Sequence, residues 1–218
     1  KAPLIQGKIL ETPILNMLNY QMAIASKTSR VTRAAGETPV SAFGTRRAHG
    51  FDSAVYGNKA SIIAGCYNHS NLMTELKFGL PSIGTMSHSY IQTFGIGVES
   101  EYRAFDTFIK GRRDKNGSLV LLVDTYSVKS GVKNAIKAFK ENGIDDNYKG
   151  IYGIRIDSGD LAYLSKFAKK EFLNEGFLKA TITLTNGLDE DLILSLKEQG
   201  AKVDFFGVGD AIAVSKSN

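Results

Sequence analysis

Short apolar runs recur along the chain, and each ends in polar residues or glycine. The three clearest runs occupy residues 119–123, 151–156 and 203–206. Runs of this length bounded by turn-forming residues are typical of strands buried in a parallel sheet. Because parallel α/β folds build their active sites where the strands end, the polar residues after each run predict an enzyme.

Segments with the spacing of amphipathic helices alternate with these strands. Apolar residues recur at i, i+3, i+4 and i+7 from Val132 to Phe139, and Gly143 follows where a helix C-cap is expected. Similar spacing recurs over residues 161–172 and 192–196, on either side of a further strand at residues 181–185. This order is typical of parallel strands joined by right-handed crossovers.

Two more strands are predicted upstream, at residues 40–43 and 80–83, which makes at least six strand ends that carry glycine or polar residues. Crossovers that repeat in series without a reversal favour closure over an open doubly wound sheet. We therefore predict an α/β fold of the parallel α/β barrel class, TIM-like and irregular. With 43% hydrophobic residues, the chain is expected to form one catalytic barrel domain over residues 1–218.

The composition of the chain argues against several classes of protein. The chain begins at Lys1 and ends after a loop, so we expect it to be a fragment of a longer protein. It contains no visible secretory signal, no apolar run of about 18 residues and a single cysteine, so a cytoplasmic protein without membrane contact is expected. The net charge of +5 is not accompanied by a basic and aromatic module, so nucleic-acid binding is not predicted.

The strand ends carry the candidate chemistry, and the densest cluster follows residues 151–156. Arg155 and Asp157 lie two apart and share a face, which offers a cation for an anionic group and a carboxylate for a hydroxyl or a metal. Ser158 and Asp160 can instead cap the following helix, and the two interpretations are compatible.

Arginine and histidine side chains follow the upstream strands. Arg46 and Arg47 can clamp a phosphate or carboxylate, and on an extended segment they would point in opposite directions, so we expect at least one to face the site. His88 stands in a glycine-led turn, where a lone histidine is structural or catalytic. No pair among the three histidines has the spacing of metal ligands, so no protein metal site is predicted.

Five segments at the strand ends carry a recognisable combination of residues. The segments are Phe43-Gly44-Thr45-Arg46-Arg47-Ala48, Gly84-Thr85-Met86-Ser87-His88-Ser89, Leu121-Leu122-Val123-Asp124-Thr125-Tyr126, Arg155-Ile156-Asp157-Ser158-Gly159-Asp160-Leu161 and Gly207-Val208-Gly209. In this order, from residue 11 onward, the chain resembles the nicotinate phosphoribosyltransferase family, and the combination is far more specific than any single segment.

The resemblance implies a type II phosphoribosyltransferase of NAD biosynthesis. Such an enzyme joins nicotinate to 5-phosphoribosyl 1-diphosphate, coupled to ATP hydrolysis, and gives nicotinate mononucleotide and diphosphate. It implies that His88 is phosphorylated by ATP and that Thr85 and Arg155 contact nicotinate. Mg²⁺ as cofactor and a homodimer are expected. The family's amino-terminal domain and carboxyl-terminal extension are expected to be absent from this fragment.

The remaining candidates are assigned to the ribosyl and phosphate groups. Asp124 and Asp157 are expected to hold ribose hydroxyls or to stabilise the cationic ribosyl centre. Other residues at the strand ends are candidate substrate contacts, namely Arg46, Arg47, Ser158, Gly159 and Asn186.

The phosphate loop departs from the family pattern. Gly207 and Gly209 are expected to bring backbone N–H groups to the 5-phosphate, but Asp210 stands where the family has threonine or serine. A carboxylate repels phosphate unless it is turned away or paired, so this contact is in doubt. Two rivals stay open: a nicotinamide phosphoribosyltransferase, disfavoured by Ile156, and a barrel that binds a nucleotide or a protein without catalysis.

Overall fold

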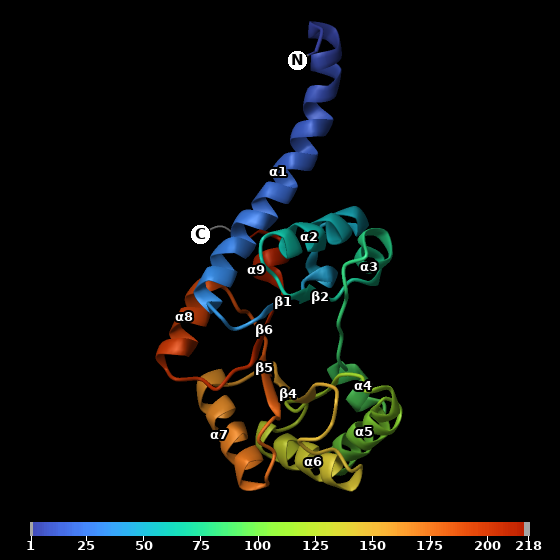
Figure 1. Cartoon of the computed structure of the whole chain (residues 1–218), viewed down its shortest axis with the longest axis vertical. Coiled ribbons are helices and arrows are strands. Elements are labelled where there is room, and N and C mark those ends of the chain that lie inside the picture. Colours follow the sequence, from blue (N-terminus) through green and yellow to red (C-terminus); the bar gives the residue numbers. More distant parts are fainter. Residues whose placement is uncertain (1, 216–218) are drawn as a thin grey trace. The chain divides into compact units, whose positions relative to one another are not determined.

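The computed structural model describes residues 2–215, which group into two compact units (Figure 1). Among the described residues, the first unit comprises residues 2–83, Gly187–Asp191 and residues 208–215, and the second comprises Gly84–Asn186 and Leu192–Gly207. Within the described residues, no helix combines the length and the apolar character needed to cross a membrane.

Six strands form one hydrogen-bonded ladder in the order β2-β1-β6-β5-β4-β3. The pairs β1–β2, β3–β4, β4–β5 and β5–β6 are parallel, as predicted from the alternation of strands and helices. The strands are β1 (Val40–Ala42), β2 (Asn68–His69), β3 (Leu119–Leu122), β4 (Tyr152–Ile156), β5 (Thr181–Leu184) and β6 (Phe205–Val208).

The prediction of a closed barrel is wrong for the described residues. The strand order is that of a barrel opened between β2 and β3, and the strand predicted at residues 80–83 is reduced to a single bridge between Ser82 and His69. The cause is local: Pro81 has no N–H to donate, and the N–H of Ser82 donates to a carboxylate oxygen of Glu75 at 3.1 Å. Pro81 and Ser82 therefore cannot donate to the neighbouring strand, and the contact is limited to this bridge, where the Ile83 N–H donates to the His69 carbonyl at 2.8 Å.

The second unit places helices around β3, β4 and β5 (Figure 1). The segments predicted as helices after β3 and β4 form α6 and α7, and Gly143 and Gly176 take positive φ values of 67° and 85° just after them. Phe139, Phe172 and Phe177 pack with Tyr152 in one aromatic cluster of the core. The helices are α4 (His88–Gln92), α5 (Val98–Lys110), the 3₁₀ turn η2 (Arg113–Lys115), α6 (Val128–Glu141) and α7 (Leu161–Asn174).

The first unit is dominated by a long helix that the sequence pattern did not predict, α1 (Leu4–Ala35). Its last turns are buried, and the Lys27 ammonium, 2% exposed, lies 2.7 Å from a carboxylate oxygen of Glu190. Its first turns expose apolar side chains on all sides. The other helices are η1 (Thr45–Arg47), α2 (Phe51–Ile63), α3 (Leu72–Phe78) and α9 (Asp210–Ala213), while α8 (Glu190–Glu198) begins in this unit and continues into the second.

Candidate functional site

Asp124 is the centre of a polar cluster at the strand ends of the second unit. Its side chain is only 1% exposed, and it lies two residues beyond β3. One carboxylate oxygen is 3.1 Å from Nε2 of His88, and the other accepts hydrogen bonds from the Ser158 hydroxyl at 2.6 Å and the Asp157 backbone N–H at 3.2 Å. Three partners from two segments therefore fix this carboxylate in one orientation.

His88 presents its ring to this carboxylate from the start of α4. The hydroxyl of Ser87 accepts a hydrogen bond from the Tyr90 backbone N–H at 3.2 Å and so caps the helix that carries His88. The His88 side chain remains 41% exposed. When the Nε2–H of a neutral imidazole donates to a carboxylate, Nδ1 keeps its lone pair, so the geometry orients His88 as a nucleophile or base at Nδ1.

The end of β5 joins the same cluster through Asp157. The Thr185 hydroxyl donates to Oδ1 of Asp157 at 2.5 Å, so residues that follow β3, β4 and β5 meet at one edge of the sheet. Asp160 is the N-cap of α7, with its carboxylate accepting from the Tyr163 N–H at 2.9 Å. Asp160 therefore caps the helix, whereas Ser158 does not and instead donates a hydrogen bond to Asp124.

Arg155 is the last but one residue of β4. Arg155 is half-buried on β4, in register with Leu122 and Thr183 of the adjacent strands. Because side chains alternate along a strand, Arg155 lies on the face of β4 opposite to the buried Ile154 and Ile156. Arg155 therefore shares a face with Asp157, which lies two residues further along the chain.

The Thr85 hydroxyl already donates a hydrogen bond within the protein, from Oγ1 to the carbonyl of Val120 on β3. A ligand at this residue would meet the hydroxyl oxygen as an acceptor. Gly159 and Asn186 shape the neighbouring turns with positive φ values of 80° and 86°. Asn186 is exposed, and asparagine is one of the non-glycine residues that most readily adopt a left-handed conformation.

Sequence reasoning missed a buried acid in this unit, Glu101 of α5. Its side chain is fully buried, and burial, with a smaller contribution from the charge of Asp124, raises its pKa to about 7. A signal was present in the sequence, because Glu101 falls on the apolar face that Ala104 and Phe105 define at i+3 and i+4.

The other predicted residues belong to the first unit, where the phosphate-loop candidates lie. Arg46 and Arg47 form part of the 3₁₀ turn η1, so the expectation of an extended segment with opposed side chains is wrong. Nε of Arg47 lies 3.0 Å from a carboxylate oxygen of Asp210, and both side chains are more than half exposed. Asp210 is the residue that departs from the family pattern, and this ion pair neutralises its carboxylate.

The glycine loop is shorter than predicted. Gly207 and Val208 are buried residues of β6, which runs two residues beyond the predicted strand end, and the Val208 carbonyl accepts from the Phe43 N–H at 2.8 Å. Only Gly209 lies between this strand and α9. A Cβ on Gly44 would come within 2.6 Å of the Gly209 carbonyl oxygen, so a glycine at residue 44 permits the two strand ends to approach.

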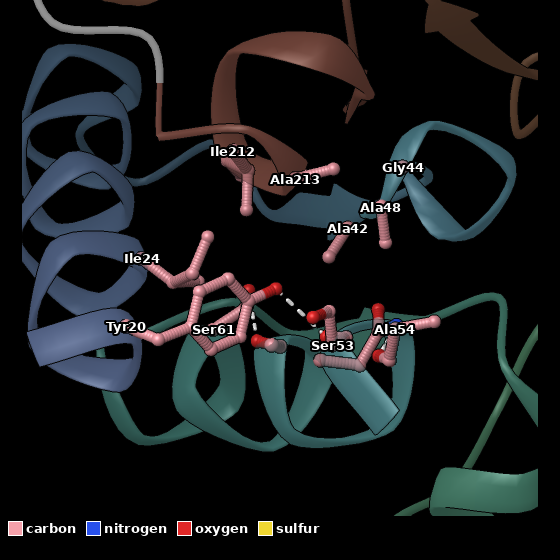
Figure 2. A pocket seen from close by; sticks show the side chains of 12 residues that line it. Tyr20, Ile24, Ala42, Gly44, Ala48, Ser53, Ala54, Ser61, Ile212 and Ala213 are labelled. Carbon is pink, nitrogen blue, oxygen red and sulfur yellow. Dashed lines mark hydrogen bonds between the residues drawn. The ribbon is translucent and has the colours of Figure 1, made fainter. Parts of the chain in front are cut away.

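A small cavity lies behind this turn, between α1, α2, β1 and α9 (Figure 2). Its volume is about 10 Å³, which is room for one water at most. The Tyr20 hydroxyl at its edge donates to the Ser53 carbonyl at 2.8 Å. The cavity is therefore a packing feature and has no space for a substrate.

The remaining histidines take different positions in the first unit. His49 is exposed, whereas His69 is fully buried, accepts from the Asn71 N–H at Nδ1 and has a pKa lowered by burial. Within residues 2–215, no three histidine, cysteine or acidic side chains gather closely enough to hold a metal ion by themselves.

Comparison with known proteins bears on the resemblance expected from the motifs. No protein-family model matches the chain. The chain is 41% identical over 210 residues to a nicotinate phosphoribosyltransferase of Bacillus subtilis, which covers 96% of the chain and 41% of the relative. It is 38% identical to a nicotinate phosphoribosyltransferase of Mycobacterium tuberculosis, over 99% of the chain and 44% of the relative.

Solved structures share the fold. A nicotinate-nucleotide pyrophosphorylase from Pyrococcus furiosus matches with a TM-score of 0.76 and 27% identity, over 90% of this chain and 48% of that one. Human nicotinic acid phosphoribosyltransferase matches with a TM-score of 0.70 at 22% identity, over 95% and 51%. The resemblance is therefore confirmed across nearly the whole chain, which spans less than half the length of these curated relatives.

Proposed function

We propose that this chain forms part of a nicotinate phosphoribosyltransferase of NAD biosynthesis, with the second unit carrying the nicotinate and phosphohistidine chemistry. The observation that carries the proposal is the contact between His88 and the buried Asp124, in a chain similar to these enzymes over nearly its whole length. The reaction joins nicotinate and 5-phosphoribosyl 1-diphosphate to give nicotinate mononucleotide and diphosphate, and ATP hydrolysis is coupled to it.

His88 is the phosphoryl acceptor in this account. Nδ1 attacks the γ-phosphorus of ATP, a nitrogen–phosphorus bond forms, and the bond to the oxygen of departing ADP breaks. Asp124 accepts the Nε2–H and stabilises the positive charge that develops on the ring, which supports the assignment of this histidine. Hydrolysis of the phosphohistidine then returns the free imidazole.

Nicotinate is held by charge and by hydrogen bonding at the end of β4. The Arg155 guanidinium matches the planar pyridine carboxylate in a bidentate pair, and the Thr85 hydroxyl can donate to the same carboxylate once it releases the Val120 carbonyl. The pyridine nitrogen forms the new bond to the ribosyl carbon while the bond from that carbon to diphosphate breaks. Asp157, oriented by Thr185, stabilises the cationic centre or a ribose hydroxyl.

Phosphate groups are assigned to the first unit and to Mg²⁺. Arg47, Arg46 and the backbone at Gly209 are the candidate donors to phosphate oxygens. Mg²⁺ is usually held by one or two carboxylates together with substrate phosphates, and the half-buried Asp157 fits that role. Bound Mg²⁺ would neutralise charge on the departing diphosphate.

The complete protein is proposed to be a homodimer in which the first half of α1 is covered. A helix that is apolar on all sides is normally buried, yet Leu4, Ile5 and Ile9 are 78%, 75% and 69% exposed here. This exposure supports burial of the helix against other parts of the complete protein or a second copy.

The test is an assay of nicotinate mononucleotide formation by the complete protein, with and without ATP and with nicotinate or nicotinamide as the acceptor. We expect product from nicotinate, and more product per unit time when ATP is present. Preference for nicotinamide would replace this function by that of the related enzyme. Binding of 5-phosphoribosyl 1-diphosphate without turnover of either acceptor would replace it by a binding role.

A further inference from the structure

Ser158 is a residue of the polar cluster to which the proposed reaction gives no role. It lies two residues beyond β4, and its side chain is exposed. Its hydroxyl donates to Oδ2 of Asp124 at 2.6 Å, which is the shortest of the three contacts to that carboxylate. Hydrogen bonds from a hydroxyl to an ionised carboxylate are typically about 2.5–2.7 Å long and about twice as strong as bonds between neutral groups. Ser158 is therefore a strong partner of Asp124.

The two oxygens of Asp124 have separate partners. Oδ1 lies 3.1 Å from Nε2 of His88, whereas Oδ2 accepts from the Ser158 hydroxyl and, at 3.2 Å, from the Asp157 backbone N–H. Because both oxygens belong to one planar group, a bond that fixes Oδ2 also fixes the direction of Oδ1. The hydroxyl of Ser158 therefore directs Oδ1 of Asp124 toward the imidazole of His88.

The backbone on both sides of Ser158 is fixed by contacts of its own. Before it, the Asp157 carboxylate accepts a hydrogen bond from the Thr185 hydroxyl at 2.5 Å. After it, Gly159 turns the chain with a φ of 80°, and Asp160 then caps α7. Since these contacts lie within the protein, the Ser158 hydroxyl is preorganised for Asp124 before a ligand binds.

The same hydrogen bond argues against a direct contact between Ser158 and an anionic substrate. A hydroxyl has one proton, and here that proton is donated to Asp124. Carboxylate and phosphate oxygens only accept hydrogen bonds, so a substrate anion would have to take this proton away from a carboxylate that is 1% exposed. Removing a donor from a buried carboxylate is unfavourable, so we expect Ser158 to keep its bond to Asp124.

We propose that Ser158 is a positioning residue for phosphoryl transfer to His88, and that it acts through Asp124. As Nδ1 of His88 attacks phosphorus, positive charge develops on the imidazole, and a carboxylate already directed at Nε2 stabilises that charge without reorganisation. A carboxylate that is free to turn would have to be reoriented in each transfer. The inference rests on the proposed function, because it concerns the step that phosphorylates His88.

The experiment measures how fast ATP with a labelled γ-phosphate labels the complete protein, over a range of ATP concentrations. In Ser158→Ala, we expect the labelling rate at saturating ATP to fall about tenfold or more, which is the equivalent of one hydrogen bond to a charged group. The ATP concentration that gives half the maximal rate should change by less than about twofold, because the lost hydroxyl acts on Asp124 and not on ATP. Ser158→Thr, which keeps the hydroxyl, should restore the rate to within about threefold of the parent chain.

Ser130→Ala is the matched control. Ser130 lies in the first turn of α6, and its hydroxyl donates to the Ser127 carbonyl at 3.0 Å. The substitution makes the same chemical change outside the Asp124 cluster, so it should leave labelling unchanged. Because the Ser158 side chain is exposed, Ser158→Ala should fold like the parent chain, which circular dichroism verifies.

Three results would overturn the proposal. The first is labelling of Ser158→Ala at the parent rate, and the second is a slow rate that Ser158→Thr does not restore. The third is a higher ATP concentration for half the maximal rate with the maximal rate unchanged, which would make Ser158 a contact for ATP. Failure of the proposed function would look different, because the parent chain itself would then take up no label.

Discussion

Gly131 offers the sharpest test of how the fold positions the site. It lies in the first turns of α6, and a Cβ added there would stand 2.1 Å from the Val123 carbonyl oxygen and 2.8 Å from the carbonyl carbon. Ordinary contacts of this kind are about 3.4 Å or longer, so α6 or the end of β3 must move by about 1 Å in Gly131→Ala. The moving backbone directly precedes Asp124.

The expected magnitude combines two opposing effects. Alanine is favoured over glycine within a helix by about 1 kcal/mol. Overpacking costs about 1–3 kcal/mol, and the upper end applies because the neighbour of Gly131 is backbone. We therefore expect Gly131→Ala to lower the free energy of unfolding by about 2 kcal/mol, which is a melting temperature lower by roughly 4–8 °C.

Gly7→Ala is the matched control, because Gly7 is also helical and nothing lies within 4 Å of a Cβ built there. Thermal denaturation followed by circular dichroism should rank the control at or above the parent chain and Gly131→Ala below it. A displacement of about 1 Å at Asp124 should also lower kcat/KM by up to ~100-fold in the complete protein. Equal melting temperatures for the two variants would refute the close packing of α6 on β3.

Three further substitutions, the last with a matched control, test the nicotinate site, the phosphate loop and the buried ion pair. Arg155→Lys should lose bidentate pairing and weaken nicotinate use by about 1–3 kcal/mol, and an unchanged kcat/KM for nicotinate would remove Arg155 from the site. Asp210→Thr should free Arg47 and lower the KM for 5-phosphoribosyl 1-diphosphate, whereas a higher KM would give Asp210 a role of its own. Lys27→Met should lower the free energy of unfolding, measured in urea, by about 3 kcal/mol, because it leaves the Glu190 carboxylate with Arg30 alone. The control Lys8→Met, at an exposed ion pair, should change this free energy by less than about 0.5 kcal/mol. Equal effects of the two lysine substitutions would contradict the burial of Lys27.

The sequence was most informative where strands and helices alternate regularly. Apolar runs and helical spacing located β3, β4, β5, α6 and α7 within a few residues. Because parallel strands end at one edge, the same pattern also brought Asp124, Asp157 and Ser158 together before any contact was known.

The sequence pattern did not predict the elements that lack a regular alternation of apolar and polar residues. Helix α1 has apolar residues on all sides in its first turns, so it shows no amphipathic spacing, and the two residues of β2 are polar. The strand predicted at residues 80–83 failed because Pro81 has no N–H and because the carboxylate of Glu75, seven residues earlier, takes the N–H of Ser82. Pro81 was a local signal against a strand, whereas the competition from the Glu75 side chain could not be predicted from the sequence.

Phosphohistidine formation at His88 is the central claim and can be measured directly. The complete protein is incubated with ATP carrying a labelled γ-phosphate, and the labelled protein is then exposed to acid or base. A phosphoramidate is stable in base and labile in acid, so we predict label that acid removes and base does not. His88→Ala should abolish both the label and the stimulation of nicotinate mononucleotide formation by ATP, while a slow transfer without ATP persists. His49→Ala should keep both. Labelling and ATP stimulation that survive in His88→Ala would contradict the account.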